Sequence, residues 1–468
     1  MRIPDPMVRS GYFWPVGKED KMASGTLTIS DGGKVSLEIL GSFSGPTETI
    51  EDFHDETMMI GRVVGQIEKE GPVTLEHCHY QKRSFAFGGV TKSQVKAGWA
   101  VLGHSFAREE VITFDSYHIA IEGLAEWLRL SGTTLEVDEN PHSFTLRYQR
   151  PTPITLYYGD DFSISIGFGY TMPSMTNIEE VSIRQEPWLK IATNELREPV
   201  FFRRVAAQVR ELLCFALDST VSVSEAWASN SSITEDTGGE ESHAVRMDLY
   251  YGSMNHLLDP PRIDHFRILF RYPDISADTQ AIFSRWFELY TVVSPALNLY
   301  FSARAGAHKF LEGRFLSLTQ AVETLHRRTS TETAMDPAEY DELRKALIAA
   351  APGSRKAWVE QKLTFANEIS LANRIKRLLE PFNDRFGDKN HRKRLVRAIV
   401  ETRNYLTHYD SGSAEKAAGG AKLWVLCEKI EALLQLHLLT TMTFSDEQIS
   451  AICNGQALKK KLALKLGE

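Results

Sequence analysis

The sequence predicts an α+β protein of two domains, an antiparallel β-rich, sandwich-like domain followed by an all-α helical bundle. Through most of the first 190 residues, apolar residues alternate with polar ones at the period of two that half-buried strands show. From about residue 278 the apolar residues recur at helical spacing, beginning with Ile282, Trp286 and Leu289. We therefore expect a first domain over residues 1–300, with a helical connector at about 278–305, and a second over 306–468.

Two hairpin patterns indicate the antiparallel arrangement of the first domain. One runs through residues 27–39 about the turn Asp31-Gly32-Gly33, and the other through residues 154–166 about Gly159-Asp160-Asp161. Many short strands separated by turn residues are typical of an antiparallel sandwich or barrel.

The remaining elements follow from the same patterns. The segments at about 119–130, before Gly132, and 201–217 are predicted to be helices, and 245–251 and 266–272 strands. In the second half, helices are predicted at about 309–328, 338–350, 358–381, 390–408, 415–441 and 446–465.

Composition indicates a soluble, cytoplasmic protein. Hydrophobic residues make up 43% of the 468 residues and charged residues 24%, which is ordinary for a globular protein. The longest apolar stretch, 290–301, is too short to span a bilayer, and we expect no signal peptide and no membrane partner. The cysteines stand far apart without a C-x-x-C pair, which fits a reducing cytosol and argues against a zinc site: Cys78, Cys214, Cys427 and Cys453.

Charge is divided unevenly along the chain. Residues 301–468 hold 27 Lys and Arg against 20 Asp and Glu, a balance of +7, and residues 1–300 hold 26 against 41, a balance of −15. This asymmetry indicates an anionic partner for the second half, although basic residues that only solvate helical faces would give the same count.

One helix end combines residues that suit RNA cleavage. The predicted helix at 390–408 ends in Arg403-Asn404-Tyr405-Leu406-Thr407-His408. Arg403 and His408 are about 140° apart around a regular helix, so either a frayed helix end or a second protomer must bring them together. Asn404 shares a face with His408 and is placed to orient the imidazole or to contact substrate.

These residue types match the needs of the reaction. The 2′-hydroxyl of RNA attacks the neighbouring phosphate when a base removes its proton and an acid protonates the leaving 5′-oxygen. Histidine does either near neutral pH. Arginine stabilises the phosphorane oxygens with a planar, permanently charged fork, so the reaction needs no metal and no cofactor.

The helix end resembles the R-x4-6-H motif of HEPN domains, and the segment 315–328 looks like the first helix of ApeA-like HEPN domains. The first half resembles the ApeA N-terminal domain. The segments that carry this second resemblance are Gly11-Tyr12-Phe13-Trp14, Gly25-Thr26-Leu27-Thr28 and Gly123-Leu124-Ala125-Glu126-Trp127-Leu128.

The resemblance implies a metal-independent endoribonuclease in anti-phage defence, which stops growth by abortive infection. A β-rich sensor domain would restrain the HEPN ribonuclease until a phage component triggers it. The substrate would be RNA, such as tRNA or another structured host RNA. The site would be composite across a homodimer or a higher even oligomer, with Arg403, Asn404 and His408 from each motif.

Several further residues are candidates for a supporting role. Glu323 and His326 lie one turn apart and are placed to line a cleft beside His408, although a polar surface pair is the simpler interpretation. Tyr405 and Tyr409 are candidates for stacking on a base, with core packing the alternative for Tyr405. Basic residues of two helices are candidates for a phosphate track: Arg374, Lys376, Arg377, Arg392, Lys393, Arg394 and Arg397.

Other interpretations stay open. A HEPN domain that only binds RNA or a protein partner is the first alternative, and a β-sandwich ligand-binding protein with a helical dimerisation tail is the second. A second Arg–His spacing, Arg385 to His391, is interpreted as ordinary surface charge. His77-Cys78-His79 has no second ligand pair near it in sequence, so no metal site is predicted there.

Overall fold

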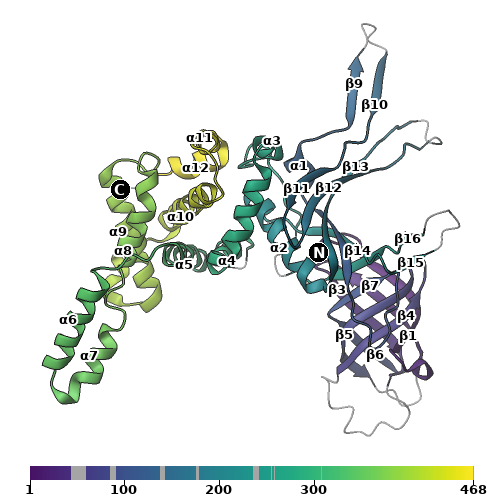
Figure 1. Ribbon diagram of the computed structural model, residues 1–468, viewed down its shortest axis with the longest axis horizontal. Coiled ribbons are helices and arrows are strands. Elements are labelled where there is room, and N and C mark those ends of the chain that lie inside the picture. Colours follow the sequence, from purple (N-terminus) through teal and green to yellow (C-terminus); the bar gives the residue numbers. More distant parts are fainter. Residues whose placement is uncertain are drawn as a thin grey trace. The chain divides into compact units, whose positions relative to one another are not determined.

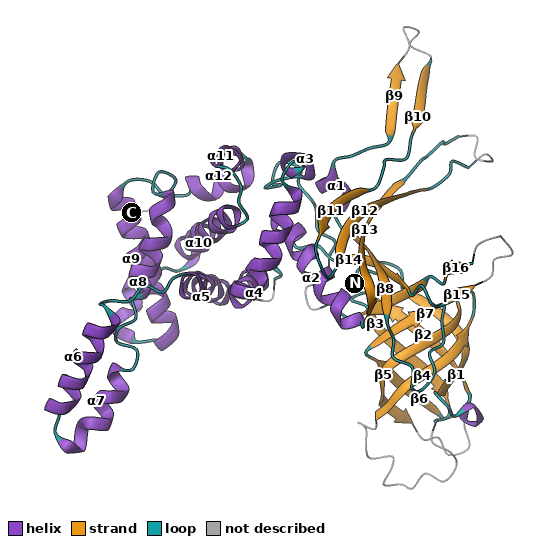
Figure 2. Ribbon diagram, viewed as in Figure 1, coloured by secondary structure: helices purple, strands orange, loops and turns teal. Residues whose placement is uncertain are grey.

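The computed structural model describes residues 1–43, 59–84, 91–137, 143–174, 176, 179–235, 242–253, 256–257, 259–306 and 308–466. The chain divides into two compact units, Met1–Phe283 and Ser284–Glu468. The first holds the strands and the second is helical, as the colours of Figure 2 show. The prediction of a β-rich domain followed by an all-α domain is therefore confirmed.

The strands of the first unit are β1 (Met7–Pro15), β2 (Ala23–Ser30), β3 (Lys34–Leu40), β4 (Met59–Ile67), β5 (Gly71–Ser84), β6 (Lys92–Ala97), β7 (Trp99–Leu102), β8 (Phe114–Ile121), β9 (Thr133–Val137), β10 (Phe144–Tyr148), β11 (Ile154–Tyr158), β12 (Ser163–Tyr170), β13 (Gln185–Arg197), β14 (Val223–Ser229), β15 (Thr234–Glu235), β16 (His243–Ala244) and β17 (Met247–Tyr251). Its helices are α1 (Leu124–Leu128), α2 (Pro199–Ala216) and α3 (Tyr272–Ile275).

Six strands close into an antiparallel barrel in the order β5-β4-β1-β2-β3-β6, because β6 pairs back onto β5 (Figure 1). The predicted hairpin at residues 27–39 is the β2–β3 pair, with Leu27 opposite Leu37. Core residues such as Phe13, Leu37 and Val95 point inward and are at most 1% exposed. Of the two arrangements that the strand pattern allows, the closed barrel is the one observed.

A bend in two strands leads the sheet out of the barrel. β6 and β7 run consecutively against β5 and are separated by Gly98, whose N–H donates to the Glu76 carbonyl at 2.8 Å. Opposite Gly98, His77 has a left-handed backbone with φ of 57°, and β5 shifts register against β4 there, which marks a bulge. From β7 the sheet continues through β17, β14, β8, β13, β12 and β11, and α2 packs against β8 and β13.

Two predicted elements of the first unit were wrong. The expected helix at 119–130 is the end of β8 followed by the single-turn α1, because Ile119 and Ile121 lie in a strand with a neighbour on each side. Ile121, Leu124 and Leu128 recur at spacings of three and four across the turn at Gly123, so periodicity does not separate the end of the strand from α1. Residues 266–272 form no strand: the Leu269 N–H donates instead to the Ala216 carbonyl at the end of α2, at 2.8 Å.

The helical unit is built around α10. Its helices are α4 (Thr279–Arg304, which begins in the first unit), α5 (Leu311–Thr329), α6 (Pro337–Ala350), α7 (Lys356–Leu363), α8 (Leu371–Leu379), α9 (Lys389–His408), α10 (Gly420–Thr441), α11 (Asp446–Asn454) and α12 (Gln456–Ala463). α10 packs against α5, α8, α9, α11 and α12, so it is buried on most of its circumference.

The helix boundaries refine the prediction. The expected helix at 358–381 is two helices, since residues 364–370 leave the helix and Ser370 caps α8 by accepting from the Asn373 N–H at 3.3 Å. The expected helix at 446–465 is divided at Gly455, whose φ of −65° and ψ of 151° are extended. α4 is kinked at Val293, two residues before Pro295, which lacks the N–H that a continuous helix needs.

A buried ion cluster joins the helices of this unit. Glu431 on α10 is 1% exposed, and it pairs with Arg304, with Lys461 at 2.7 Å and with Arg314 at 2.6 Å. Burial alone would raise the pKa of Glu431, but these three cations hold it well below its ordinary value. The carboxylate of Glu431 therefore links α10 to α4, α5 and α12.

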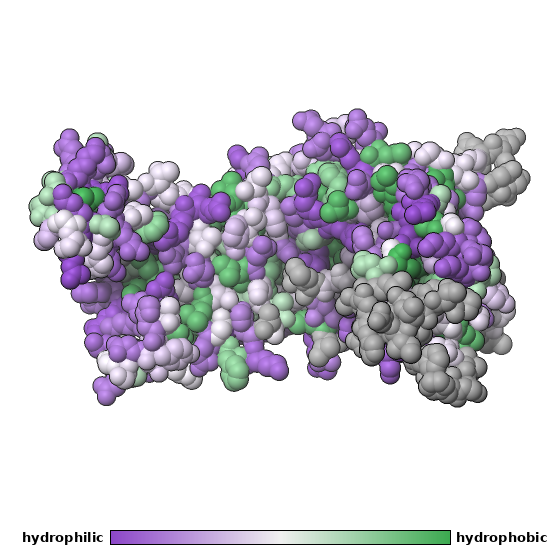
Figure 3. Space-filling model, turned by 90° about the horizontal axis from the view of Figure 1, so that it is seen from below, coloured by the Kyte–Doolittle hydropathy of each residue, from purple (hydrophilic) through white to green (hydrophobic). Residues whose placement is uncertain are grey.

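In the part of the chain that the structure describes, no helix is both long and apolar enough to cross a membrane. On the face drawn in Figure 3, hydrophobic residues lie between hydrophilic ones.

Candidate active site at the end of helix α9

α9 carries the Arg403–His408 segment on a well-defined helix. Its first turn is capped by Asp388, whose carboxylate accepts from the His391 N–H at 2.7 Å. Leu395, Ile399 and Leu406 form its buried stripe, and the helix packs against α5, α8 and α10. The rigid stripe fixes the direction of the residues on the opposite face.

The helix remains regular through His408. Tyr409 ends it in a left-handed conformation, with φ of 50°, and its N–H donates to the Tyr405 carbonyl at 2.6 Å. His408 therefore keeps its helical position, about 140° from Arg403. Within the described residues no hydrogen bond or ion pair joins His408 to Arg403. A frayed helix end does not bring the two side chains together in one protomer.

A buried carboxylate positions Arg403. Glu323 on α5 is 8% exposed and accepts from Arg327 at 3.1 Å, and its other oxygen lies 3.9 Å from Nη2 of Arg403. Nη1 of Arg403 donates to Oδ1 of Asn404 at 3.3 Å. Because the Arg403 side chain is 32% exposed, the guanidinium still presents a polar edge to solvent.

Exposed groups surround His408. The side chains of Asn404, Thr407, His408 and Tyr409 are all exposed, and the Tyr405 and Tyr409 rings meet edge to face with centroids 5.5 Å apart. Tyr405 is half-buried, whereas Tyr409 is 65% exposed. Of these two rings, that of Tyr409 is the more accessible from solvent.

His326 is buried instead of lining a cleft. It is 4% exposed, and its Nδ1 lies 3.3 Å from Nη1 of Arg374, which also pairs with Glu368 at 3.2 Å. Burial, and then the charge of Arg374, lower the pKa of His326. Glu323, expected beside His408, lies near Arg403, and His326 is held in the packed interior.

Fewer basic side chains are available to bind phosphate along this helical surface than the sequence indicates. Arg374 is 5% exposed, and Arg377 is engaged with Glu332 at 2.7 Å and Glu380 at 3.0 Å. Arg397 pairs with Glu401 at 2.8 Å, one helical turn away. Arg394 is exposed, and no ion pair of its side chain is found in the described part of the chain.

Thr402 was missed by the sequence reasoning. Its side chain is fully buried, and its Oγ1 accepts from the Ala418 N–H at 2.9 Å, which ties the segment after His408 back to α9. The signal was present in the sequence, because Leu395, Ile399, Thr402 and Leu406 continue one stripe at spacings of three and four.

Metal-binding groups do not gather in the described part of the chain, where no cluster of three or more His, Cys, Asp and Glu is placed to hold an ion. In the His77-Cys78-His79 segment, Cys78 is fully buried, and burial raises the pKa of its thiol far above the ordinary value. His77, on the opposite side of the bulge, is exposed.

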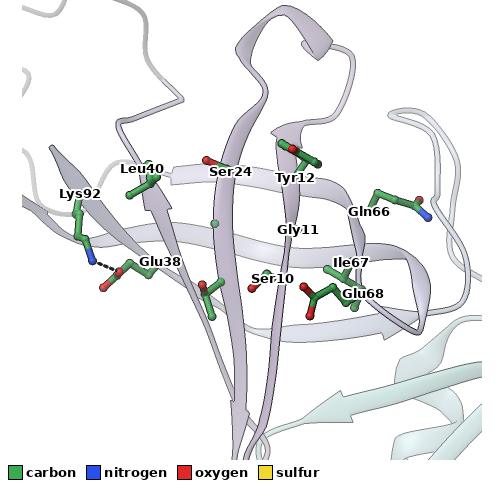
Figure 4. Close-up of a pocket in the computed structure, with 12 residues that line it drawn as sticks. Ser10, Gly11, Tyr12, Ser24, Glu38, Leu40, Gln66, Ile67, Glu68 and Lys92 are labelled. Carbon is green, nitrogen blue, oxygen red and sulfur yellow. Dashed lines mark hydrogen bonds and ion pairs between the residues drawn. The ribbon is translucent and has the colours of Figure 1, made fainter. Parts of the chain in front are cut away.

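An open hollow of about 670 Å³ lies on the barrel, far in sequence from this motif. Figure 4 shows its residues spread over neighbouring strands, with Nζ of Lys92 donating to Glu38 at 2.6 Å. Gly11 and Gly25 stand opposite each other there, and a Cβ on Gly11 would meet the Gln66 carbonyl at 2.3 Å. Since Glu38 and Lys92 neutralise each other, we assign no catalytic role to this hollow.

Comparison with known families accounts for both units. Residues 8–286 match ApeA N-terminal domain 1, and residues 316–448 match the Apea-like HEPN domain. This chain is an ApeA-like protein. The resemblance predicted from its sequence is thereby confirmed, and the HEPN match of the ApeA-like chain contains the whole Arg403–His408 segment. No curated protein and no solved structure matches the chain.

Proposed function

We propose that this ApeA-like protein is an endoribonuclease of anti-phage defence, with Arg403 and His408 as its reactive pair. One observation carries the proposal. Within the residues that match the HEPN domain, an exposed imidazole ends a regular helix, and a guanidinium five residues earlier is held by the buried carboxylate of Glu323.

The chemistry follows from the two side chains. His408 takes the proton of a 2′-hydroxyl, whose oxygen then bonds to the adjacent phosphorus. The bond from phosphorus to the 5′-oxygen breaks, and that oxygen receives a proton from water, to which the His408 imidazolium returns the proton it took. Arg403 stabilises the charge on the non-bridging oxygens of the intermediate. The products are a 2′,3′-cyclic phosphate and a 5′-hydroxyl, and the step requires no metal or cofactor.

The separation of the pair supports a composite site. On a helix that stays regular to His408, Arg403 and His408 of one protomer face different directions. In a symmetric dimer the same surface of each copy meets the other, so a two-fold axis beside this helix end would place His408 of one copy opposite Arg403 of its partner. We therefore propose a homodimer, or a higher even oligomer, as the active form.

The first unit fits the role of a sensor that controls the nuclease. Its half of the sequence carries a balance of −15, which disfavours RNA binding. We propose that a phage component acts on this unit and releases the HEPN domain in the cytoplasm. The four cysteines are buried and form no disulfide, as a reducing compartment permits.

Cleavage of a defined RNA in EDTA tests the proposal. The protein is incubated with the RNA and with a copy that carries one 2′-deoxy sugar at the cut position. We expect cleavage of the first, with cyclic phosphate ends, and resistance of the second. Cleavage of the 2′-deoxy RNA contradicts the mechanism. RNA binding without cleavage, in the dimer and with the trigger present, supports the alternative of a non-catalytic RNA-binding module.

A further inference from the structure

A second charged hollow lies at the opposite end of α9. It has a volume of about 510 Å³ and is lined by the start of α9 with the residues before it, by α10, and by the end of α12 with the residues after it. The lining residues that matter here are Phe386, Asp388, His391, Arg394, Lys429 and Lys465. His391 and His408 are seventeen residues apart on one helix, so this hollow is about 26 Å from the candidate active site.

Lys429 is the unusual member of the group. Its side chain is 2% exposed, and its Nζ donates to the Leu462 carbonyl at 2.6 Å and lies 5.8 Å from the Phe386 ring centroid. No carboxylate pairs with it among the described residues. Burial lowers the pKa of Lys429 to about 8. An ammonium group in this position is poorly compensated.

Buried cations elsewhere in the described chain have carboxylate partners. Lys461 lies 2.7 Å from Glu431, Arg374 lies 3.2 Å from Glu368, and Arg2 lies 2.9 Å from Asp31. A buried charge without a partner destabilises the folded protein by an amount on the order of several kcal/mol when no ligand is bound. An anion from outside the chain would therefore compensate the charge of Lys429.

The other groups that face the hollow add to its positive charge. Arg394 and Lys465 are exposed, and within the described residues neither forms an ion pair. The one carboxylate, Asp388, is engaged in capping α9. Burial, followed by the charges of Lys429 and Arg394, lowers the pKa of His391. Three cations thus face one carboxylate that is already in use.

We propose that this hollow binds a phosphate group, with Lys429 at its base and Arg394 and Lys465 at its rim. An ammonium with donors to spare and a planar guanidinium suit the several acceptor oxygens of phosphate. The phosphate belongs either to an RNA backbone that extends along α9 or to a small phosphorylated molecule. The proposal does not depend on ribonuclease activity, because binding is measured directly.

The test is calorimetric titration of the full chain with inorganic phosphate at low ionic strength. We expect Lys429→Met, and separately the double variant Arg394→Gln with Lys465→Gln, to weaken phosphate binding at least about tenfold. The matched control is Lys389→Gln with Lys459→Gln, which removes the same charge from exposed positions outside the hollow and leaves the affinity unchanged. Because Arg394 and Lys465 are exposed, the double variant remains informative if Lys429→Met does not fold.

Two ligands then identify the source of the phosphate. A single-stranded RNA with a 5′-hydroxyl end and a mononucleotide are titrated into the same variants. A loss confined to the RNA assigns the site to the RNA backbone, and a loss confined to the mononucleotide assigns it to a small molecule. If the wild-type chain does not bind phosphate, or if the double variant binds it as tightly as the matched control, the proposal is wrong.

Discussion

Arg403 and His408 are exposed enough that their chemistry can be tested without disturbing the fold. His408→Ala is expected to reduce RNA cleavage by roughly 10²–10⁴, the usual effect of losing a general acid–base group. Arg403→Lys keeps a positive charge near Glu323 but lacks the planar guanidinium. We therefore expect its cleavage rate to remain well below that of the wild type. Initial rates on one labelled RNA measure both effects.

A control at the same helix end separates chemistry from packing. Thr407 is exposed and lies beside His408, and its hydroxyl donates to the Arg403 carbonyl at 2.7 Å. Thr407→Ala should leave the rate within a small factor of wild type. Unchanged cleavage by His408→Ala, with loss only in His391→Ala, would show that the wrong histidine was chosen.

Glu431 tests the stability of the helical unit. Glu431→Gln removes the charge that Arg304, Arg314 and Lys461 share, and leaves these cations buried without full compensation. We expect the unfolding free energy to fall by about 3–5 kcal/mol. Denaturant unfolding of the variant is compared with Glu447→Gln, an exposed position one helix further on. Equal stability of the two variants would contradict a structural role for the cluster.

Sequence reasoning found the residues of the motif but not those of the cluster. Arg403 and His408 are local in sequence, so spacing alone selects them. The partners of Glu431 come from residues 304, 314 and 461, and no spacing rule connects positions so far apart. Lys429 was missed for the same reason, since its burial depends on the Leu462 carbonyl of a later segment.

The end of α9 depends on a contact that the segment after it provides. Thr402→Val has nearly the same shape but removes the acceptor for the Ala418 N–H, which should cost about 1 kcal/mol. We expect faster amide hydrogen exchange in residues 409–418 and a lower cleavage rate, because Tyr409 and His408 lose their support. Thr402→Ser keeps the hydroxyl and serves as the control. Equal exchange in the Val and Ser variants would exclude this support.

Elements with a clear buried stripe were predicted well, whereas some boundaries between consecutive elements were not. α5 and α9 have clear stripes, and their observed bounds lie within three residues of the expected ones. The end of β8 was predicted as a helix because Ile121, Leu124 and Leu128 continue at helical spacing across the turn at Gly123. The gap between α7 and α8 was missed because its residues still carry apolar side chains such as Phe365.

The proposed control of RNA cleavage by the first unit is a property of the whole chain. A fragment that begins at Thr279 keeps α4 intact, whereas a start near residue 301 would cut within this helix. If the first unit restrains cleavage, the dimeric fragment should cut RNA roughly 5–150-fold faster than the full chain without a trigger, the range typical of coupling between sites. A folded, dimeric fragment that cuts no faster would exclude restraint.

The closure of the barrel could not be predicted from the sequence, for a related reason. Alternation predicts strands and their hairpins, such as β2–β3, because those pairs are neighbours along the chain. Closure depends on β5 pairing with β7 before His77 and with β6 after it, and β5 also has a bulge against β4 at this position. The bulge has no residue signature that distinguishes it from a regular strand position.

Complementation between two inactive copies decides whether the site is shared. In a dimer with two composite sites, each built from Arg403 of one copy and His408 of the other, a pair of Arg403→Ala and His408→Ala copies has one doubly defective site and one intact site. Co-expression yields mixed dimers as about half of the population if the copies associate at random. We therefore expect about a quarter of wild-type activity from the mixture, and close to none from either variant alone.

The mixed dimer can be purified by placing a different tag on each copy, and its rate of RNA cleavage can then be measured directly. If the purified mixed dimer is as inactive as its parents, a site made from one Arg403 and one His408 of different protomers is excluded, because such a site would be complete in that dimer.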